Sequence, residues 1–124
     1  MPRPMPQIPF TEAAVVGRVI RALRMQLGES QQTFAVQVGI GTSSLARIES
    51  GKQDPSFSAL WGIEGCLREQ DKIGTRGVIF RGAAQALAIL ESEGHACGDD
   101  ARIQTEVVDS VVIEALRHIG VVLV

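Results

Sequence analysis

The side chains best suited to contacting DNA bases lie close together between residues 42 and 47. A guanidinium can donate two hydrogen bonds to O6 and N7 of guanine, and hydroxyl groups can reach base edges or phosphate oxygens. Arg47 is the strongest candidate because this bidentate contact discriminates between bases by about 1–3 kcal/mol. The candidate base contacts are Thr42, Ser43, Ser44 and Arg47.

A second group of reactive side chains lies near the C-terminal end, where His95, Cys97, Asp99 and Asp100 fall within six residues. Their surroundings predict a solvated loop, and His118 is the only other histidine. Neither a glycine-rich phosphate loop nor the ligand spacing of a metal site appears. We therefore expect no catalytic residue, metal or cofactor, and the two cysteines are expected to be reduced thiols.

Two short helices joined by a tight turn would position the candidate base contacts. Ser30 can cap a helix over residues 31–38, and Gly39 can adopt the left-handed conformation that ends it. After the turn, a helix over residues 42–50 would bury Leu45 and Ile48 and present its polar side chains outward. A helix about 10–12 Å across fits the major groove of B-DNA, which is roughly 12 Å wide.

Two longer helices are predicted to support this pair. The first runs from Thr11, a hydroxyl N-cap, to Gly28 with apolar side chains at spacings of three and four. The second begins after Ser56 and returns its apolar side chains to the same core.

The segment SQQTFAVQVGIGTSSLARIESGKQDPS resembles the helix-turn-helix of Cro- and CI-type repressors, also called the XRE family. Ser-Gln opens the second helix, Gly lies at the turn, RIExGK ends the third helix, and Pro-Ser begins the fourth. The resemblance covers roughly residues 15–68. One departure is Gly41, which stands where the family usually has a Ser or Thr cap, so the start of the third helix is less well defined.

The resemblance also implies roles for residues around the third helix. Gln31 would bind a phosphate and brace that helix, while Ser50 and Lys52 would contact phosphates, Lys52 through its charge. Arg24 and Glu49 would form a buried or half-buried salt bridge with an architectural role.

The composition favours an all-α protein, because apolar residues make up 45% of the 124 residues and aromatic residues only 4%. We expect a five-helix Cro/CI repressor-like helix-turn-helix domain with a mainly helical C-terminal extension. The expected parts are a flexible N-terminal arm over 1–10, the DNA-binding domain over 11–70 and the extension over 71–124. Within the extension, residues 73–81 suit either a short strand or a linker. Helices are expected over 83–93 and 103–119.

The formal net charge of −2 argues against a protein that coats nucleic acid nonspecifically. Residues 1–52 carry a net charge of +3, whereas residues 53–124 carry −5. This asymmetry suits a half that faces DNA joined to a half with another task.

The last predicted helix places apolar side chains along one side. We expect them to form an interface with a second copy or a protein partner, although they could instead cover the core of their own chain. They are Val108, Val111, Val112, Leu116 and Ile119.

The sequence therefore predicts a cytoplasmic, non-enzymatic, sequence-specific transcriptional regulator, with no membrane segment. It would act as a homodimer on a palindromic double-stranded operator, because one short helix reads few base pairs. Repression of its own operon is the expected activity. An antitoxin that also binds a toxin, or a restriction-modification or phage controller, remains an alternative with the same DNA-reading chemistry.

Overall fold

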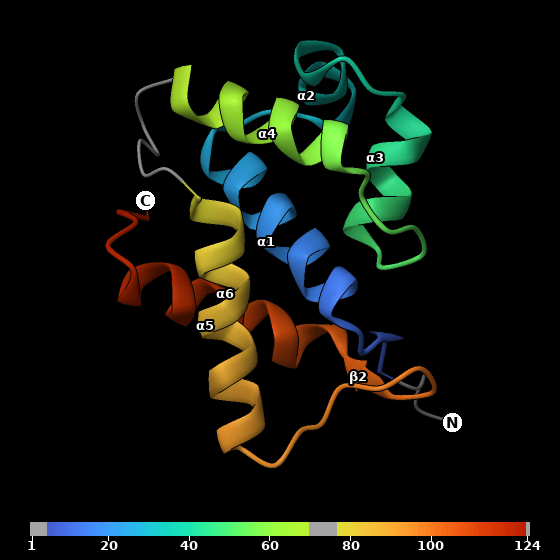
Figure 1. The fold of residues 1–124 in the computed structure, drawn as a ribbon, viewed down its shortest axis with the longest axis vertical. Helices are drawn as coiled ribbons and strands as arrows, with labels where there is room; N and C mark the ends of the chain where they lie inside the picture. The colour runs from blue at the N-terminus through green and yellow to red at the C-terminus, as the bar shows by residue number, and fades with distance from the viewer. Residues whose placement is uncertain (1–4, 70–76, 124) are drawn as a thin grey trace.

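The computed structural model of the chain describes residues 5–69 and 77–123. Figure 1 shows α1 running through the middle of the molecule, with α2, α3 and α4 above it and most of α5 and α6 below it in this view. The expected all-α class is confirmed, with one small pair of strands added. The elements are β1 Gln7–Pro9, α1 Glu12–Gln26, α2 Gln31–Val38, α3 Thr42–Glu49, α4 Phe57–Glu69, α5 Val78–Ser92, β2 Arg102–Gln104 and α6 Thr105–His118.

Short polar side chains begin three of the helices, as the sequence predicted. The Thr11 hydroxyl accepts a hydrogen bond from the backbone N–H of Ala14 at 3.1 Å and starts α1. Ser30 caps α2 through the N–H of Thr33 at 3.1 Å, and Ser56 accepts from the N–H of Ala59 at 3.0 Å at the start of α4. Each bond satisfies one of the backbone donors that a helix leaves without an intrahelical partner.

One apolar core joins the helix-turn-helix to the C-terminal extension. Helix α1 lies between them and contributes side chains to both sides, including Val15, Val19 and Leu23, which are fully buried. The core continues from α2, α3 and α4 through α1 to α5 and α6. Its largest fully buried side chains beyond α1 are Phe10, Phe34, Leu45, Ile48, Ile63, Leu67, Ile79, Leu90 and Leu116.

Helix α5 begins earlier than the sequence indicated. The β-favouring run that includes Val78 and Ile79 forms its first turn, where a helix had been expected only from residue 83. Both side chains are buried in the core, and burial on a helical face outweighs the weak strand preference of these residue types. Residues 73–76, also considered for a strand or linker, lie outside the described residues.

The N-terminal segment differs from the expected flexible arm over the part that the structure describes. Ile8 of β1 pairs with Ile103 of β2 in antiparallel register, and both side chains are buried. Phe10 is buried as well, and its backbone N–H donates to the carbonyl of Ala101 at 2.8 Å. The strand pairing, this hydrogen bond and the burial of Ile8 and Phe10 therefore fix residues 7–10 against the C-terminal half. Residues 1–4, the first part of the expected arm, lie outside the described residues.

The apolar side of α6 faces the interior of its own chain. Val108, Val111, Val112 and Leu116 are buried, and Ile119 is half-buried against the same core. The expected interface with a second copy is therefore corrected: these side chains cover the chain's own core, and α6 begins at Thr105 after the strand that contains Ile103. Four of the five side chains are thus not at the surface for a contact between copies, and Ile119 is partly exposed.

Candidate nucleic-acid interface

The turn between α2 and α3 fixes the angle at which α3 meets the surface. Gly39 adopts φ 85°, in the left-handed region, and ends α2, while its backbone N–H donates to the carbonyl of Ala35 at 2.9 Å. Phe34 and Ala35 of α2 and Leu45 of α3 are fully buried beneath the turn. One side of α3 is thereby held in the core, and its other side is left at the surface.

The candidate base contacts lie on that outer side. Thr42, Ser43 and Arg47 are exposed, and Ser44 is half-buried at the edge. Helix α3 begins at Thr42. Its N-cap residue is Gly41, where the family usually has Ser or Thr, so no side-chain hydrogen bond caps the helix. The backbone amides of this first turn therefore lie beside the hydroxyls that would meet base edges or phosphate oxygens.

The Arg47 guanidinium is oriented by a neighbour. Its Nε donates to Oε1 of Gln53 at 2.9 Å. This bond uses one of the five donors of the guanidinium group. The backbone carbonyl of Arg47 also accepts from the N–H groups of Lys52 and Gln53, which folds the end of α3 back toward the side chain.

The candidate phosphate contacts flank α3. Ser50, half-buried, donates from its hydroxyl to the Arg47 carbonyl at 3.2 Å, and Lys52 is exposed in the following turn. Gln31 begins α2, and its side-chain amide donates to Oε1 of Glu49 at 3.1 Å. Gln31 therefore links the first turn of α2 to the last turn of α3.

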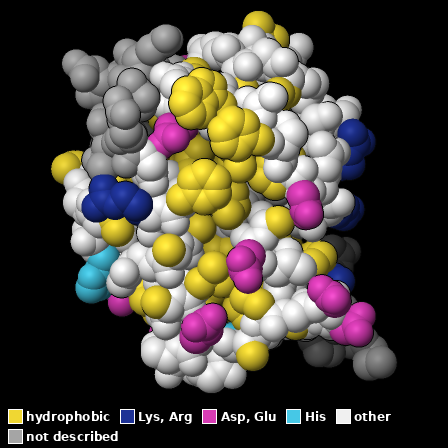
Figure 2. Space-filling view, in the orientation of Figure 1, with side chains coloured by type: hydrophobic (Ala, Val, Ile, Leu, Met, Phe, Trp, Pro, Cys, Tyr) yellow, Lys and Arg dark blue, Asp and Glu magenta, His cyan; other side chains and the backbone are white. Residues whose placement is uncertain are grey.

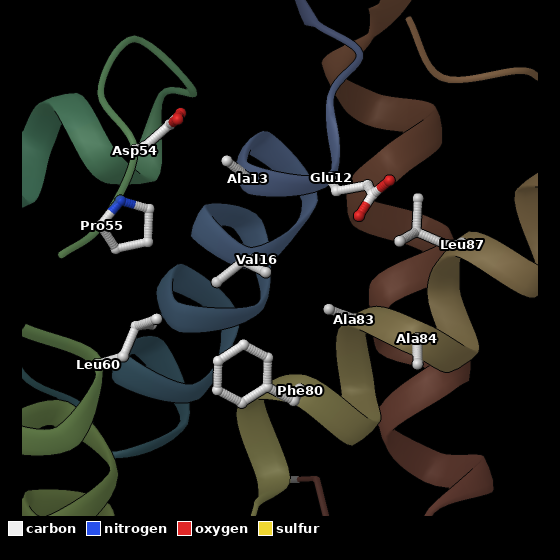
Figure 3. Close-up of a pocket in the computed structure, with 10 residues that line it drawn as sticks. All are labelled: Glu12, Ala13, Val16, Asp54, Pro55, Leu60, Phe80, Ala83, Ala84 and Leu87. Atoms are coloured by element: carbon white, nitrogen blue, oxygen red, sulfur yellow. The ribbon is translucent and has the colours of Figure 1, made fainter. Parts of the chain in front are cut away.

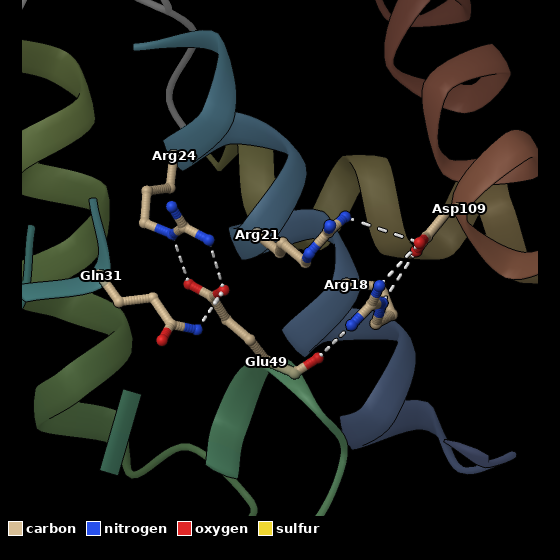
Figure 4. Close-up of polar contacts among 6 residues, drawn as sticks. All are labelled: Arg18, Arg21, Arg24, Gln31, Glu49 and Asp109. Atoms are coloured by element: carbon tan, nitrogen blue, oxygen red, sulfur yellow. Dashed lines mark hydrogen bonds and ion pairs between the residues drawn. The ribbon is translucent and has the colours of Figure 1, made fainter. Parts of the chain in front are cut away.

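The Glu49 carboxylate is the centre of the network drawn in Figure 4. Arg24 binds it in bidentate fashion, from Nε to Oε2 at 2.8 Å and from Nη2 to Oε1 at 2.9 Å. Glu49 is 2% exposed, and Arg24 also donates to the carbonyl of Glu29 at 2.7 Å. The structure thus contains the ion pair that the family resemblance implied, and it ties α1 to the end of α3.

A second ion pair, which the sequence reasoning missed, joins α1 to α6. Arg18 donates from Nε and Nη2 to the two carboxylate oxygens of Asp109 at 2.8 and 2.6 Å, and from Nη1 to the backbone carbonyl of Glu49 at 2.8 Å. Arg21 lies 3.5 Å from the same carboxylate. Figure 4 shows both arginines reaching Asp109. One side chain therefore connects α1, α6 and the last residue of α3.

The sequence does indicate that one member of this pair, Arg18, needs a charged partner. Arg18 lies four residues after Ala14 and four before Ala22, and both alanines are buried. A charged residue at such a position requires a partner, because a buried unpaired charge is strongly destabilising. Nothing local identifies that partner, since Asp109 is 91 residues away.

Gly17 allows α1 and α3 to approach closely, and the sequence reasoning missed this as well. A Cβ atom at this position would lie 2.0 Å from the backbone oxygen of Ile48. Only a glycine fits that contact, which places α1 directly against the end of the candidate reading helix. The contact explains why a residue of low helix propensity stands in the middle of α1.

The loop that contains His95 and Cys97 shows no arrangement for catalysis in the part of the chain that the structure describes. Burial, followed by the charges of Glu12 and Glu91, raises the pKa of the Cys97 thiol, which lowers its thiolate fraction, whereas a nucleophilic cysteine needs the opposite shift. Within residues 5–69 and 77–123, there is no group of three or more His, Cys, Asp or Glu side chains that could bind a metal ion. None of the described helices has the length and apolar character needed to cross a bilayer.

Comparison with known proteins agrees with the geometry of α2 and α3. The sequence model of the helix-turn-helix family matches residues 20–69. Over 49 residues the chain is 43% identical to YazB, an uncharacterized HTH-type transcriptional regulator of Bacillus subtilis, and the match covers 40% of this chain and 71% of YazB. No solved structure matches the chain. The chain therefore belongs to the XRE-type helix-turn-helix family of DNA-binding transcriptional regulators.

Proposed function

We propose that the chain represses its own operon by inserting α3 into the major groove of a palindromic operator. The observation that carries the proposal is the two-sided character of α3. Its inner side is held by Leu45, Ile48 and the Arg24–Glu49 ion pair, while Thr42, Ser43 and Arg47 stand exposed on the other. A rigidly held helix with a polar outer side is the arrangement that major-groove reading requires.

The proposed contacts divide into two kinds. Arg47 would bind guanine O6 and N7, with Thr42, Ser43 and Ser44 at neighbouring base edges or phosphates. Gln31, Ser50 and Lys52 would contact phosphates on either side and set the position of α3 in the groove. Base contacts would supply the sequence preference, and phosphate contacts would supply affinity that falls with salt.

Two copies would be needed for a specific site. Helix α3 has eight residues and can contact only a few base pairs. A twofold dimer places two reading helices on half-sites roughly 34 Å apart, which multiplies the base contacts and gives a palindromic operator. Repression would follow where such a site overlaps the promoter.

A mobility-shift titration on DNA from directly upstream of the chain's own gene tests this proposal. Random-sequence competitor and a salt series separate specific from nonspecific binding. The proposal predicts a competitor-resistant complex with two copies per duplex. If random-sequence DNA displaces the protein as well as unlabelled upstream DNA does, the proposal is contradicted.

A further inference from the structure

An open groove runs along the face of the molecule where α1, α4 and α5 meet. Its volume is about 420 Å³, and its lining residues are drawn in Figure 3. Ala13 and Val16 of α1 form its floor, Leu60 stands on one side, and Phe80 and Leu87 of α5 stand on the other. Small side chains on the floor between larger ones at the sides leave room for bulky apolar groups.

Large apolar side chains continue this surface beyond the groove. Phe57 and Trp61 of α4 stack at 5.9 Å and are 76% and 72% exposed, and Phe80 at the groove wall is 53% exposed. Figure 2 shows hydrophobic side chains gathered in a band over α4 and α5, with acidic side chains beside it. An apolar band of this kind on a soluble protein marks a surface that another molecule covers.

The groove is acidic at one end. Among the described residues that line it, only Glu12 and Asp54 are charged, and both lie at the end away from Phe80 (Figure 3). A neighbouring hollow shares these two carboxylates and adds Asp99. The site therefore combines an apolar stretch with an acidic end, and none of the described residues that line either hollow is Lys or Arg.

We infer that this groove binds an amphipathic helix of a partner protein, with large apolar side chains at one end and lysine or arginine at the other. A channel flanked by side chains from two helices accepts the apolar stripe of a third helix, whose anchors recur at spacings of three and four. Basic side chains of the partner would meet Glu12, Asp54 and Asp99. This role is separate from DNA reading, which uses α3.

Charge argues against a second copy as the occupant. Groove-to-groove pairing about a twofold axis would place Glu12 and Asp54 against either the acidic end or the apolar end of the other copy, and no basic residue stands among the described lining residues to compensate them. A basic partner turns the same carboxylates into favourable contacts. Leu60, Phe80 and Leu87 would pack against apolar side chains of either occupant, so they do not distinguish the two.

A pair of designed peptides tests the inference on the full chain. One is a labelled helical peptide with leucines at spacings of three and four, followed by a turn rich in lysine. The other keeps every leucine and replaces lysine with glutamate. In fluorescence anisotropy we expect saturable binding of the lysine peptide, at least about tenfold tighter than the glutamate peptide, and weakened by salt.

Matched substitutions locate the site. Ala84 lines the groove and is exposed, whereas Ala88, also exposed on α5, does not line it. Ala84→Arg should weaken the lysine peptide about tenfold or more, and Ala88→Arg should leave binding unchanged. Asp54→Asn, in an exposed loop, should weaken the lysine peptide without weakening the glutamate peptide, whose repulsion by the acidic end it reduces. Far-UV circular dichroism checks that each variant is folded.

Three results would overturn the inference. Equal binding of the two peptides would show that the acidic end plays no part. Equal binding by the Ala84→Arg and Ala88→Arg variants would place the peptide elsewhere. A dimer in sedimentation velocity that Ala84→Arg disperses and Ala88→Arg preserves would identify a second copy as the occupant. Retained operator binding by a variant that has lost the peptide separates this test from that of the proposed repressor function.

Discussion

At the scale of single residues, Glu49 joins the end of α3 to α1 and α2. Its carboxylate accepts from Arg24 and Gln31, and its backbone carbonyl accepts from Arg18. These donors come from α1 and α2, so the last residue of α3 is held by both supporting helices. The sequence resemblance implied the Arg24 contact, whereas the Arg18 contact depends on the packed structure.

Replacing Glu49 with Gln should therefore destabilise the fold. The substitution keeps the size of the side chain but leaves Arg24 with a buried, uncompensated charge, and removing one partner of a buried pair costs about 3–5 kcal/mol. Urea unfolding measures the change. Glu114→Gln, at an exposed position of α6, is the control and should change stability by less than about 0.5 kcal/mol. Similar changes in the free energy of unfolding for the two variants would mean that the network adds little to stability.

Cys97 allows a test of local electrostatics. Because burial and nearby carboxylates raise the pKa of this thiol, thiolate forms at higher pH in the folded chain than in the unfolded chain. The rate of alkylation at Cys97, followed by peptide mass spectrometry across a pH series, should have a higher midpoint in buffer than in urea. Glu91→Gln should lower the folded-state midpoint. A midpoint in buffer at or below that in urea would contradict the assignment.

At the scale of helices, the contact between α1 and α3 depends on Gly17. Its Cα lies so close to the Ile48 carbonyl that no side chain fits between them. The contact sets the position of the end of α3, and thereby the orientation of its exposed side. Gly65 offers a comparison, because it also lies inside a helix but has open space where a Cβ would be.

Two alanine substitutions should therefore act in opposite directions. Gly17→Ala should lower the free energy of unfolding by about 3 kcal/mol, since the new methyl group forces α1 and α3 apart. Gly65→Ala should raise it by about 0.5–1 kcal/mol through helix propensity alone. Thermal unfolding of both variants checks the pair. A Gly17→Ala protein as stable as the parent would refute the close packing.

The sequence was most informative where a helix carries its own start and stop signals. Ser30 and Gly39 delimit α2 at the predicted residues, and α3 begins at Thr42 as expected. The beginning of α5 could not be predicted, because Val78 and Ile79 are helical only through their burial against distant elements. The pairing of Ile8 with Ile103 was equally hidden, since two three-residue strands give too short a pattern to detect.

At the scale of the whole molecule, the helix-turn-helix and the C-terminal extension share one core. Arg18 joins α1 to Asp109 of α6, and the apolar side of α6 fills the space behind α1 and α5. The sequence showed that α6 was amphipathic but not what it covers, because that depends on contacts between residues far apart in the chain. The extension is therefore part of the fold that supports α3.

Removing α6 should unfold the protein. A chain ending at Gln104 loses Val108, Val112 and Leu116, each fully buried, and leaves the opposing side of the core in water. A chain ending at Val121 loses the exposed Val122 and the half-buried Leu123 but keeps all of α6, and should unfold cooperatively like the parent. Circular dichroism on heating distinguishes the two. A cooperative transition in the shorter chain would show that the extension is a separate unit.

The most direct test of the central claim, that the outer side of α3 reads base sequence, is the affinity of an Arg47→Ala variant. Its binding to an operator duplex and to a random duplex is compared by fluorescence anisotropy, with Arg117→Ala on the exposed side of α6 as the control. We predict that Arg47→Ala loses about 1–3 kcal/mol of binding free energy on the operator and little on random DNA. Lys52→Ala should instead weaken binding to both duplexes and reduce its salt dependence. Equal losses on the two duplexes, or a loss as small as that of Arg117→Ala, would contradict base reading by α3.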